Sequence, residues 1–587
     1  MAEILHNDLL QYYKRELVYL RDQGSNFAKR YPKVASMLSL HGTESLDPHT
    51  ERLIESVAFL AARVHQDLDR EFPQVAAALL DNLCPSLIQP VPSMTVAQFH
   101  LDPAQGKVTA GFKIPQHTAL YASASGGQQC RFRTAWNTVL WPVSVSRAAL
   151  EGGSTLRLTF ECSPETDFSE LELDRLRLHL QGDWMTTMPL YEFLVADVVS
   201  ASLVPEGGLP QFLPHGSWRE VGYSEDENVL PLPRNAQPAY GLMQEYFSFP
   251  RKFHFFDVLN LRARLGSCKR FDLILTLGQP ARGLGNISAD NFRLGCTPVV
   301  NLFPKTSEPI LVDHRHYEYL LVADRQREAT TEVHSIVSVT ASDPNAERPV
   351  LVPSFSALGH IRSDEQTSFW SSRREHSLRK DISGTDVFLS FVDQANTLKT
   401  PVEPVVFANL LCTNRRLAEQ VPIGARMVAE GISNTATVRC LYEPTSQRNP
   451  PLGSETLWRL VSLLTLNHQS LVDGSTGKDQ LREMLTLFAS DSTRDHEQIR
   501  GIRGLQARSV TGRVGNDAWR GYCRGTEVTL EFDEEAFVGG SQLLMSAVLA
   551  RFFAMYTSVN SFVQLGVHRG DEVWKQWEPM SGRQLVL

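Results

Sequence analysis

The stretch LRLHL at residues 176–180 alternates leucine with arginine and histidine, and this alternation predicts a strand with one buried face. Runs of similar composition lie on both sides of it, separated by turn-forming clusters such as GGLPQFLPHG at 207–216. These runs are TLRLTF from 155, KFHFFDV from 252, FDLILTL from 271, VHSIVSV from 333, DVFLSFV from 386 and PVVFANLLC from 404. We therefore expect a long β-rich middle, sandwich-like or barrel-like and mostly antiparallel.

The first 90 residues have the apolar spacing of helices. Apolar side chains recur every three or four residues up to Tyr31–Pro32, and again from Asp47–Pro48 to Phe72–Pro73. A third, short helix is expected to carry Leu79 and to end at Pro85. The two longer stripes are Leu10, Tyr13, Leu17 and Leu20, and then Leu53, Val57, Leu60 and Val64. We expect these helices to form a small bundle, or arms that partner chains complete.

Helical spacing returns near residue 454. One stripe runs from Leu457 to Leu471 with Asn467 as its polar exception, and a shorter one lies at 481–488. After them come the strand TEVTLEF at 526–532 and an apolar stripe from Leu544 to Phe562. This order of elements predicts a C-terminal α/β region, in which the helices cover a sheet.

The length of 587 residues exceeds what one compact core holds, and about 150 residues per domain gives roughly four units. The predicted fold class is α+β multidomain. The expected parts are a helical region at 1–90, a first β-rich domain at 91–280, a second at 281–445 and a C-terminal α/β domain at 446–587.

Composition excludes several classes of protein. Hydrophobic residues make up 42% and charged residues 21%, which is typical of a globular chain, and the net charge of −9 argues against nucleic-acid wrapping. We find neither an uninterrupted apolar stretch near 20 residues nor a secretory signal pattern, so the expected location is the cytoplasm. The eight cysteines form no CxxC pair, which favours scattered, reduced thiols.

The sequence also lacks the short motifs that carry common enzyme chemistry. It contains no HExxH, GxSxG or GxxxxGK[ST] pattern, and DGSTGKDQ at 473–480 reads as a turn. His314 and His316 could share one face of a strand and hold a metal, but no third ligand is identifiable. Carboxylate pairs such as Glu534–Glu535 read as solvated surface. We therefore predict no enzyme, no cofactor and no metal.

Arginines are concentrated between Arg494 and Arg524, with glycines interleaved. Such a stretch can follow a phosphate backbone, but it has few aromatic residues on which bases would stack. A protein interface or a surface loop fits better, and Arg503 and Arg508 are the predicted contact residues.

Several blocks of sequence resemble one known family. They are YYKRELVYLRDQGSNFAKRYPKVASML from 12, DPHTERLIESVAFLAARVHQDLD from 47, PSMTVAQF from 92, QEYFSFPRKFHFFDV from 244, CTPVVNLF from 296, EPILVDHRHYEYLLV from 308, LLCTNRRLAEQ from 410, LWRLVSLLTLNHQSL from 457, YCRGTEVTLEFDE from 522 and RFFAMYTSVNSFVQL from 551. In this order they resemble the TssF family, also called ImpG or VasA, whose members are baseplate subunits of the bacterial type VI secretion system.

This resemblance implies a structural role. Two TssF copies are expected to embrace one TssG and to join TssK and TssE in a wedge. The wedges would surround the VgrG spike hub, where tail tube and sheath polymerise. The resemblance implies no nucleic-acid partner. It also implies a location at the inner face of the inner membrane, which the protein would contact only through the membrane complex.

Two alternatives from other classes remain open at this stage. The first is a glycan-processing enzyme built on the β-rich middle, which would need a buried carboxylate pair in a cleft. The second is a nucleic-acid-binding module that uses Arg494–Arg524, which would bind in a salt-sensitive manner.

Overall fold

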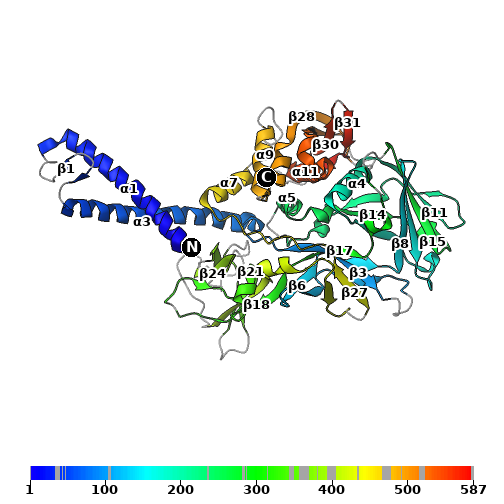
Figure 1. Ribbon diagram of the computed structural model, residues 1–587, viewed down its shortest axis with the longest axis horizontal. Coiled ribbons are helices and arrows are strands. Elements are labelled where there is room, and N and C mark those ends of the chain that lie inside the picture. Colours follow the sequence, from blue (N-terminus) through cyan, green and yellow to red (C-terminus); the bar gives the residue numbers. More distant parts are fainter. Residues whose placement is uncertain are drawn as a thin grey trace.

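Two long N-terminal helices, α1 (Ala2–Arg30) and α3 (Pro48–Leu83), project from the body of the computed structural model as a hairpin (Figure 1). The N-terminus lies beside the body, α1 runs outward, and α3 returns from the tip. The structure describes residues 2–33, 40–41, 44–45, 48–102, 108–233, 237–280, 284–285, 287–313, 315–342, 349–355, 369–377, 379, 381–392, 405–432, 435–465, 477–490, 492–514, 522–570 and 572–582.

Ion pairs join the two helices of this hairpin, which we call the arm. The Arg21 guanidinium lies 2.5 Å from the Glu51 carboxylate, and the Glu16 carboxylate lies 2.8 Å from the His65 ring. The later of the two α1 residues pairs with the earlier of the two α3 residues, so α1 and α3 are antiparallel. Two short paired strands, β1 (Leu40–His41) and β2 (Glu44–Ser45), lie at the tip.

The prediction of separate helices on either side of Pro73 is wrong, because α3 continues through this proline. A proline inside a helix removes one hydrogen bond and costs about 3 kcal/mol or more. Burial beyond the proline offsets that cost, since Ala76, Leu80 and Cys84 are fully buried in the core of the body. Helix α7 (Ser454–Thr465) packs beside α3 (Figure 1). One helix therefore extends from the arm tip into the body.

Two antiparallel sheets share one apolar core in the first β-rich region. Their strand orders are β13-β14-β10-β16 and β12-β11-β15-β9-β8. The strand predicted from the alternating leucines is β10, and Leu176, Leu178 and Leu180 are buried in this core as expected. The strands are β8 (Val143–Glu151), β9 (Thr155–Cys162), β10 (Arg175–Leu180), β11 (Val198–Pro205), β12 (Gln211–Phe212), β13 (Trp218–Val221), β14 (Phe255–Leu259), β15 (Arg270–Leu277) and β16 (Phe292–Arg293).

A closed barrel draws strands from both predicted β-rich domains. Its order is β17-β3-β27-β26-β5-β6, so strands from before and after residue 280 are mixed around it. The four-part division of the chain stays a proposal, but its second and third parts are joined in this barrel. The strands are β3 (Met94–Leu101), β5 (Ala119–Ser123), β6 (Gln129–Thr134), β17 (Cys296–Val300), β26 (Arg426–Ala429) and β27 (Ala436–Cys440), with the separate pair β4 (Phe112–Ile114) and β7 (Thr138–Leu140).

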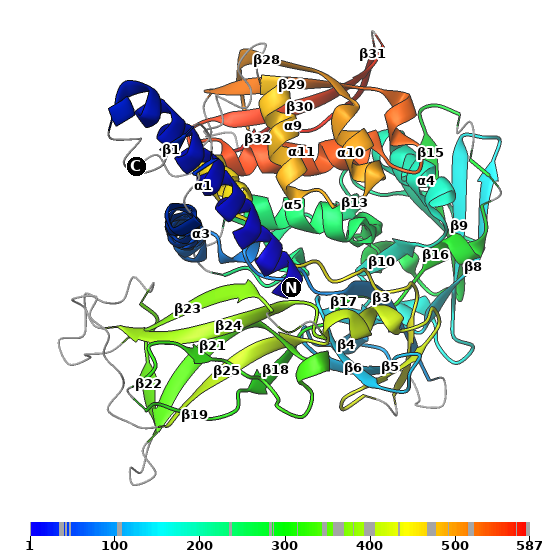
Figure 2. The same cartoon turned by 60° about the vertical axis from the view of Figure 1, so that its left-hand side comes forward.

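Two further antiparallel sheets pack together below the arm (Figure 2). One has the order β18-β25-β21-β22 with β19 also paired to β25, and the other has the order β20-β24-β23. Their strands are β18 (Phe303–Thr306), β19 (Ile310–Leu311), β20 (Tyr319–Leu320), β21 (Glu332–Ser342), β22 (Val350–Val352), β23 (Phe369–His376), β24 (Thr385–Val392) and β25 (Val405–Thr413). The runs from 333, 386 and 404 are thus strands, as predicted.

The C-terminal region is an α/β unit, in agreement with the sequence prediction. β29 (Cys523–Phe532) pairs in parallel with β30 (Phe562–Arg569), and α11 (Gln542–Tyr556) connects them against the sheet. α11 also contacts α4 (Trp184–Ala196) and α5 (Pro238–Ser248), which belong to the first β-rich region. One core cluster therefore runs from the root of α3 to α11. The sheet is completed by β28 (Ile502–Gly512), β31 (Glu572–Gln576) and β32 (Met580–Ser581).

Two predictions for this region are wrong in detail. The apolar stripe from Leu544 does not continue as a helix to Phe562, because Thr557 takes an extended backbone conformation and ends α11. The interpretation of Arg494–Arg524 as a loop also fails, since α10 (Thr493–Arg500) and β28 occupy much of it. Pairing with β29 supplies the hydrogen bonds of β28, and these do not depend on a clear apolar alternation. The helix predicted at 481–488 is α9 (Gly477–Phe488).

Candidate partner interface

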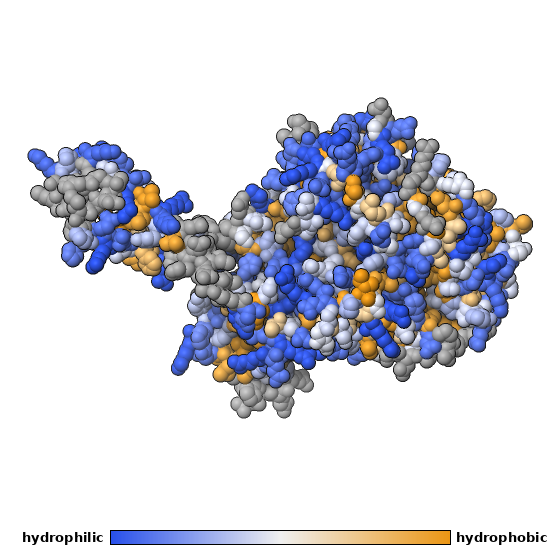
Figure 3. Space-filling view, in the orientation of Figure 1, coloured by the Kyte–Doolittle hydropathy of each residue, from blue (hydrophilic) through white to orange (hydrophobic). Residues whose placement is uncertain are grey.

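The apolar stripe of α3 faces away from α1 and is uncovered. Leu53 and Leu60 are 64% and 62% exposed, and Val57 and Val64 are 45% and 56% exposed. Soluble proteins rarely leave contiguous apolar patches in water, and such patches mark sites of association. Figure 3 shows apolar side chains gathered along the arm between polar ones.

The side of α3 that α1 covers carries small residues instead. Ala58 and Ala62 are fully buried, and their small side chains let the two helices approach closely. The four large side chains on the other side follow one another at spacings of four, three and four residues, the repeat of a coiled-coil seam. Valines then occupy the a positions and leucines the d positions, a combination that favours two-stranded packing. This outer seam is therefore shaped to receive a helix.

The apolar stripe of α1 is less exposed than the stripe of α3. Leu10 is 41% exposed, whereas Tyr13, Leu17 and Leu20 are half-buried. These three lie among the residues that pair with α3, so much of their apolar surface is already used within the arm. The sequence predicted both stripes as partner contacts, and the structure leaves the α3 stripe the more open of the two.

The sequence analysis missed three other exposed apolar residues of the arm. They are Val18, Tyr19 and Phe59. Their spacing does not continue the two stripes, so only the exposure of each side chain in the folded arm identifies them.

Basic side chains flank the α3 seam on one side. Arg52 and Arg63 are exposed and lie about one quarter turn from the seam, at 100° per residue. Among the described residues, neither arginine takes part in an ion pair. A helix that packs on the seam would therefore meet a basic flank, which favours acidic residues on that helix.

Arg503 and Arg508 lie on β28 of the body and are separate from the arm (Figure 1). Their side chains are 66% and 77% exposed, and each forms an ion pair with a carboxylate of β29 or of the residue that follows it. Arg503 lies 2.8 Å from the Asp533 carboxylate, and Arg508 lies 2.7 Å from the Glu527 carboxylate. Exposed pairs of this kind contribute about 0–1 kcal/mol. Both guanidinium groups thus remain accessible from solvent.

Of the two histidines that the sequence offered as metal ligands, His316 lies within the described residues. His316 lies 3.2 Å from Asp313, and backbone donation from Arg315 together with His316 lowers the pKa of that carboxyl to about 2. Asp47, His314 and Asn467 lie outside the described residues. The part of the chain that the structure describes contains no group of three or more His, Cys, Asp and Glu side chains placed to hold a metal.

Among the described residues, no helix combines the length and the apolar character that crossing a membrane requires.

Comparison with known proteins places these features in one family. A model of the type VI secretion system protein TssF matches residues 5–584. The type VI secretion system component TssF1 of Pseudomonas aeruginosa is 32% identical over 612 aligned residues, which cover 98% of each chain.

Two solved structures also resemble this chain. A chain of a TssK-TssF-TssG baseplate subcomplex from the type VI secretion system matches with a TM-score of 0.73 and 23% identity, over 91% of this chain and all of the other. A chain of the type VI secretion system baseplate complex matches with a TM-score of 0.58 and 23% identity, over 98% of this chain and all of the other. The multidomain α+β fold is therefore shared with both.

Proposed function

Because this chain belongs to the TssF family of the type VI secretion system, we propose that it is a structural baseplate subunit that assembles through its arm. The observation that carries this proposal is the uncovered α3 seam of Leu53, Val57, Leu60 and Val64. Burying each such side chain stabilises a complex by about 1.5–3 kcal/mol relative to leaving it in water.

TssG is the proposed partner of the arm, with two copies of this chain for each TssG. The structural relative with the TM-score of 0.73 comes from a complex of TssF with TssG and TssK, which supports both as partners here. The α3 seam consists of residues at heptad positions a and d, and Arg52 and Arg63 lie beside it. Such a surface fits an amphipathic helix with acidic flanking residues. TssE, the VgrG hub and the tube and sheath proteins complete the proposed assembly, in the cytoplasm at the inner face of the inner membrane.

Co-purification tests this proposal directly. We expect co-expression with tagged TssG to yield a complex whose mass, measured by native mass spectrometry, corresponds to two copies of this chain and one TssG. Addition of TssK should increase that mass. Recovery of this chain only as a free monomer would contradict the proposal.

The arginines of β28 are proposed as a second contact, either with TssG or with the second copy of this chain. Replacing them in the double variant Arg503→Glu with Arg508→Glu should leave the isolated protein folded, because both side chains are exposed. Charge reversal at the rim of an interface should weaken the complex, by about tenfold for two charges. Dissociation constants from biolayer interferometry with immobilised TssG measure the effect.

The matched control reverses two other exposed arginines of the body. Arg262 and Arg416 are 62% and 72% exposed, and each lies at 3.9–4.0 Å from one carboxylate. Arg262→Glu with Arg416→Glu changes the net charge equally. An equal loss of affinity in both double variants would show a general charge effect and would exclude β28 as a contact.

A further inference from the structure

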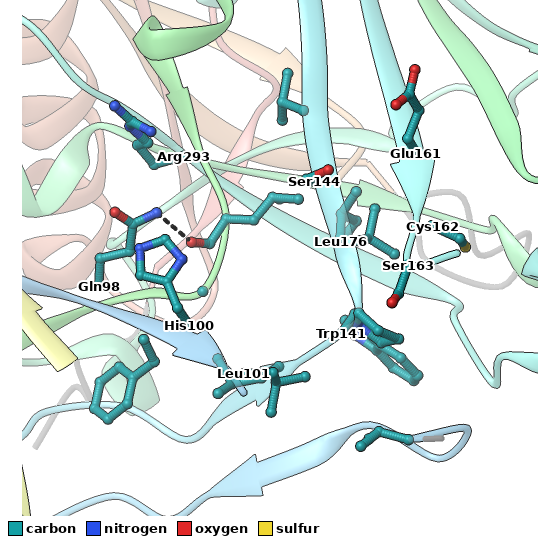
Figure 4. A pocket seen from close by; sticks show the side chains of 18 of the residues that line it. Gln98, His100, Leu101, Trp141, Ser144, Glu161, Cys162, Ser163, Leu176 and Arg293 are labelled. Atoms are coloured by element: carbon teal, nitrogen blue, oxygen red, sulfur yellow. Dashed lines mark hydrogen bonds between the residues drawn. The ribbon is translucent and has the colours of Figure 1, made fainter. Parts of the chain in front are cut away.

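A groove of about 550 Å³ lies on the body, between the barrel and the sheets that follow it. Gln98 and His100 of β3 lie on one side of it, and Ser144 of β8 and Glu161 of β9 lie on the other (Figure 4). The Gln98 side chain donates a hydrogen bond to the backbone oxygen of Leu294 at 3.2 Å, which fixes one wall. Its volume is within the usual range of ligand sites.

Two sheet edges border this groove. β8 is the last strand of one sheet and β16 is the last strand of the other, and Val143, Ser144 and Arg293 from these strands line the groove. The open side of an edge strand presents backbone N–H and C=O groups to whatever lies beside it. An extended peptide can pair with such an edge, and this is a common mode of recognition.

Apolar side chains form the lower part of the groove. Figure 4 shows Leu101 and Trp141 in this part, and Leu176 between Trp141 and Ser144. Leu176 is buried, whereas Leu101 and Trp141 are only half-buried and retain surface that a ligand can cover. A bound segment would therefore gain free energy by placing large apolar side chains here.

The basic side chains of the groove are already engaged. Arg177 donates a hydrogen bond to Asp257 at 2.8 Å, and Arg293 donates one to Asp290 at 2.9 Å. The pKa of His100 lies below its ordinary value, first because of partial desolvation and then because of nearby arginines, and both disfavour a positive charge on its ring. These groups therefore offer little net positive charge to a ligand.

Two carboxylates of the lining lack such partners. Within the described ranges, neither Glu161 nor Glu165 forms an ion pair. Arg270 lies opposite Glu161 across the sheet, but its guanidinium lies 3.3 Å from the Glu206 carboxylate. The charge that the groove leaves uncompensated is negative, so its ligand should be basic.

We propose that this groove binds an extended segment of another chain in which arginine or lysine alternates with large apolar side chains. Successive side chains of an extended segment point to opposite sides, so basic residues can face Glu161 and Glu165 while apolar ones face Trp141. The backbone of the segment pairs with the part of the β8 edge that lines the groove, at Val143 and Ser144. This contact lies on the body and is independent of the arm.

A synthetic peptide tests the groove with the full chain. The probe is a fluorescein-labelled octapeptide of alternating valine and arginine, and binding is followed by fluorescence anisotropy. N-methylation of alternate amides in the same peptide removes main-chain donors, and we expect about tenfold weaker binding. A peptide of alternating valine and glutamate should not bind. Equal binding of all three peptides, or no binding of the first, would overturn the proposal.

A pair of double variants distinguishes the groove from general charge attraction. Glu161→Lys with Glu165→Lys should weaken binding of the valine–arginine peptide about tenfold, because two attractions become repulsions. The control, Glu483→Lys with Glu535→Lys, changes the net charge equally at exposed positions outside the groove lining and should bind as the parent does. Unchanged binding by the groove variant, or equal weakening in both variants, would refute the site.

Discussion

Phe552→Ala is expected to destabilise the protein by about 3–5 kcal/mol and to reduce its soluble yield sharply. Phe552 lies on α11, is 0% exposed and belongs to the core shared by the C-terminal unit and the first β-rich region. Its ring centroid lies 4.9 Å from that of Tyr556 and 6.5 Å from that of Tyr240 on α5. Truncation would leave a cavity that the rigid neighbours on α11 and α5 cannot fill.

Thermal unfolding followed by circular dichroism measures this effect. The control is Phe212→Ala, because the Phe212 side chain is 72% exposed at the edge strand β12 and its loss should leave the melting temperature nearly unchanged. A soluble Phe552→Ala protein with the parent melting temperature, which fails only in assembly, would show that α11 is an interface rather than core.

The double variant Leu53→Asp with Leu60→Asp is expected to abolish the complex with TssG while the isolated chain stays folded. Both side chains are more than 60% exposed on the arm, so their replacement removes no intramolecular core. In the complex, the two carboxylates would be buried in an apolar seam without partners, at a cost of several kilocalories per mole. Size-exclusion chromatography of the co-expressed proteins, with melting curves of the free chain, measures both effects.

A matched control places aspartates at exposed apolar positions of the body. Leu209 and Ile423 are 83% and 65% exposed, and Leu209→Asp with Ile423→Asp introduces the same charge outside the arm. We expect this variant to assemble normally. Assembly by the Leu53 and Leu60 variant would show that the α3 seam does not bind the partner.

The arm illustrates which features of this protein can be predicted from the sequence. The periodicity of α1 and α3 was readable, because apolar spacing in a helix follows from local geometry. Both stripes were predicted as contacts, but the sequence did not distinguish them. In the structure Leu17 is half-buried against the second helix, whereas Leu60 faces solvent. Which face α1 covers depends on the small side chains Ala58 and Ala62, and only the folded hairpin shows it.

The sequence by itself determined the strands at 155, 176, 271, 333, 386 and 404, the C-terminal α/β unit and the family, because each rests on local alternation or on matching blocks of residues. Only the tertiary structure decided which strands meet across the chain. In the closed barrel, β3 pairs with β17 and with β27. Both strands lie hundreds of residues further along the chain, so no local pattern in the sequence indicates this pairing.

Tertiary packing also determines where the helix and strand preferences of the local sequence are overridden. α3 continues through Pro73 because burial of Ala76 and Leu80 outweighs the lost hydrogen bond. β28 forms in an arginine- and glycine-rich stretch because β29 pairs along it. The groove beside Glu161 exists only because two sheets and the barrel meet there. In each case the deciding free energy comes from contacts between distant segments, which no window of the sequence contains.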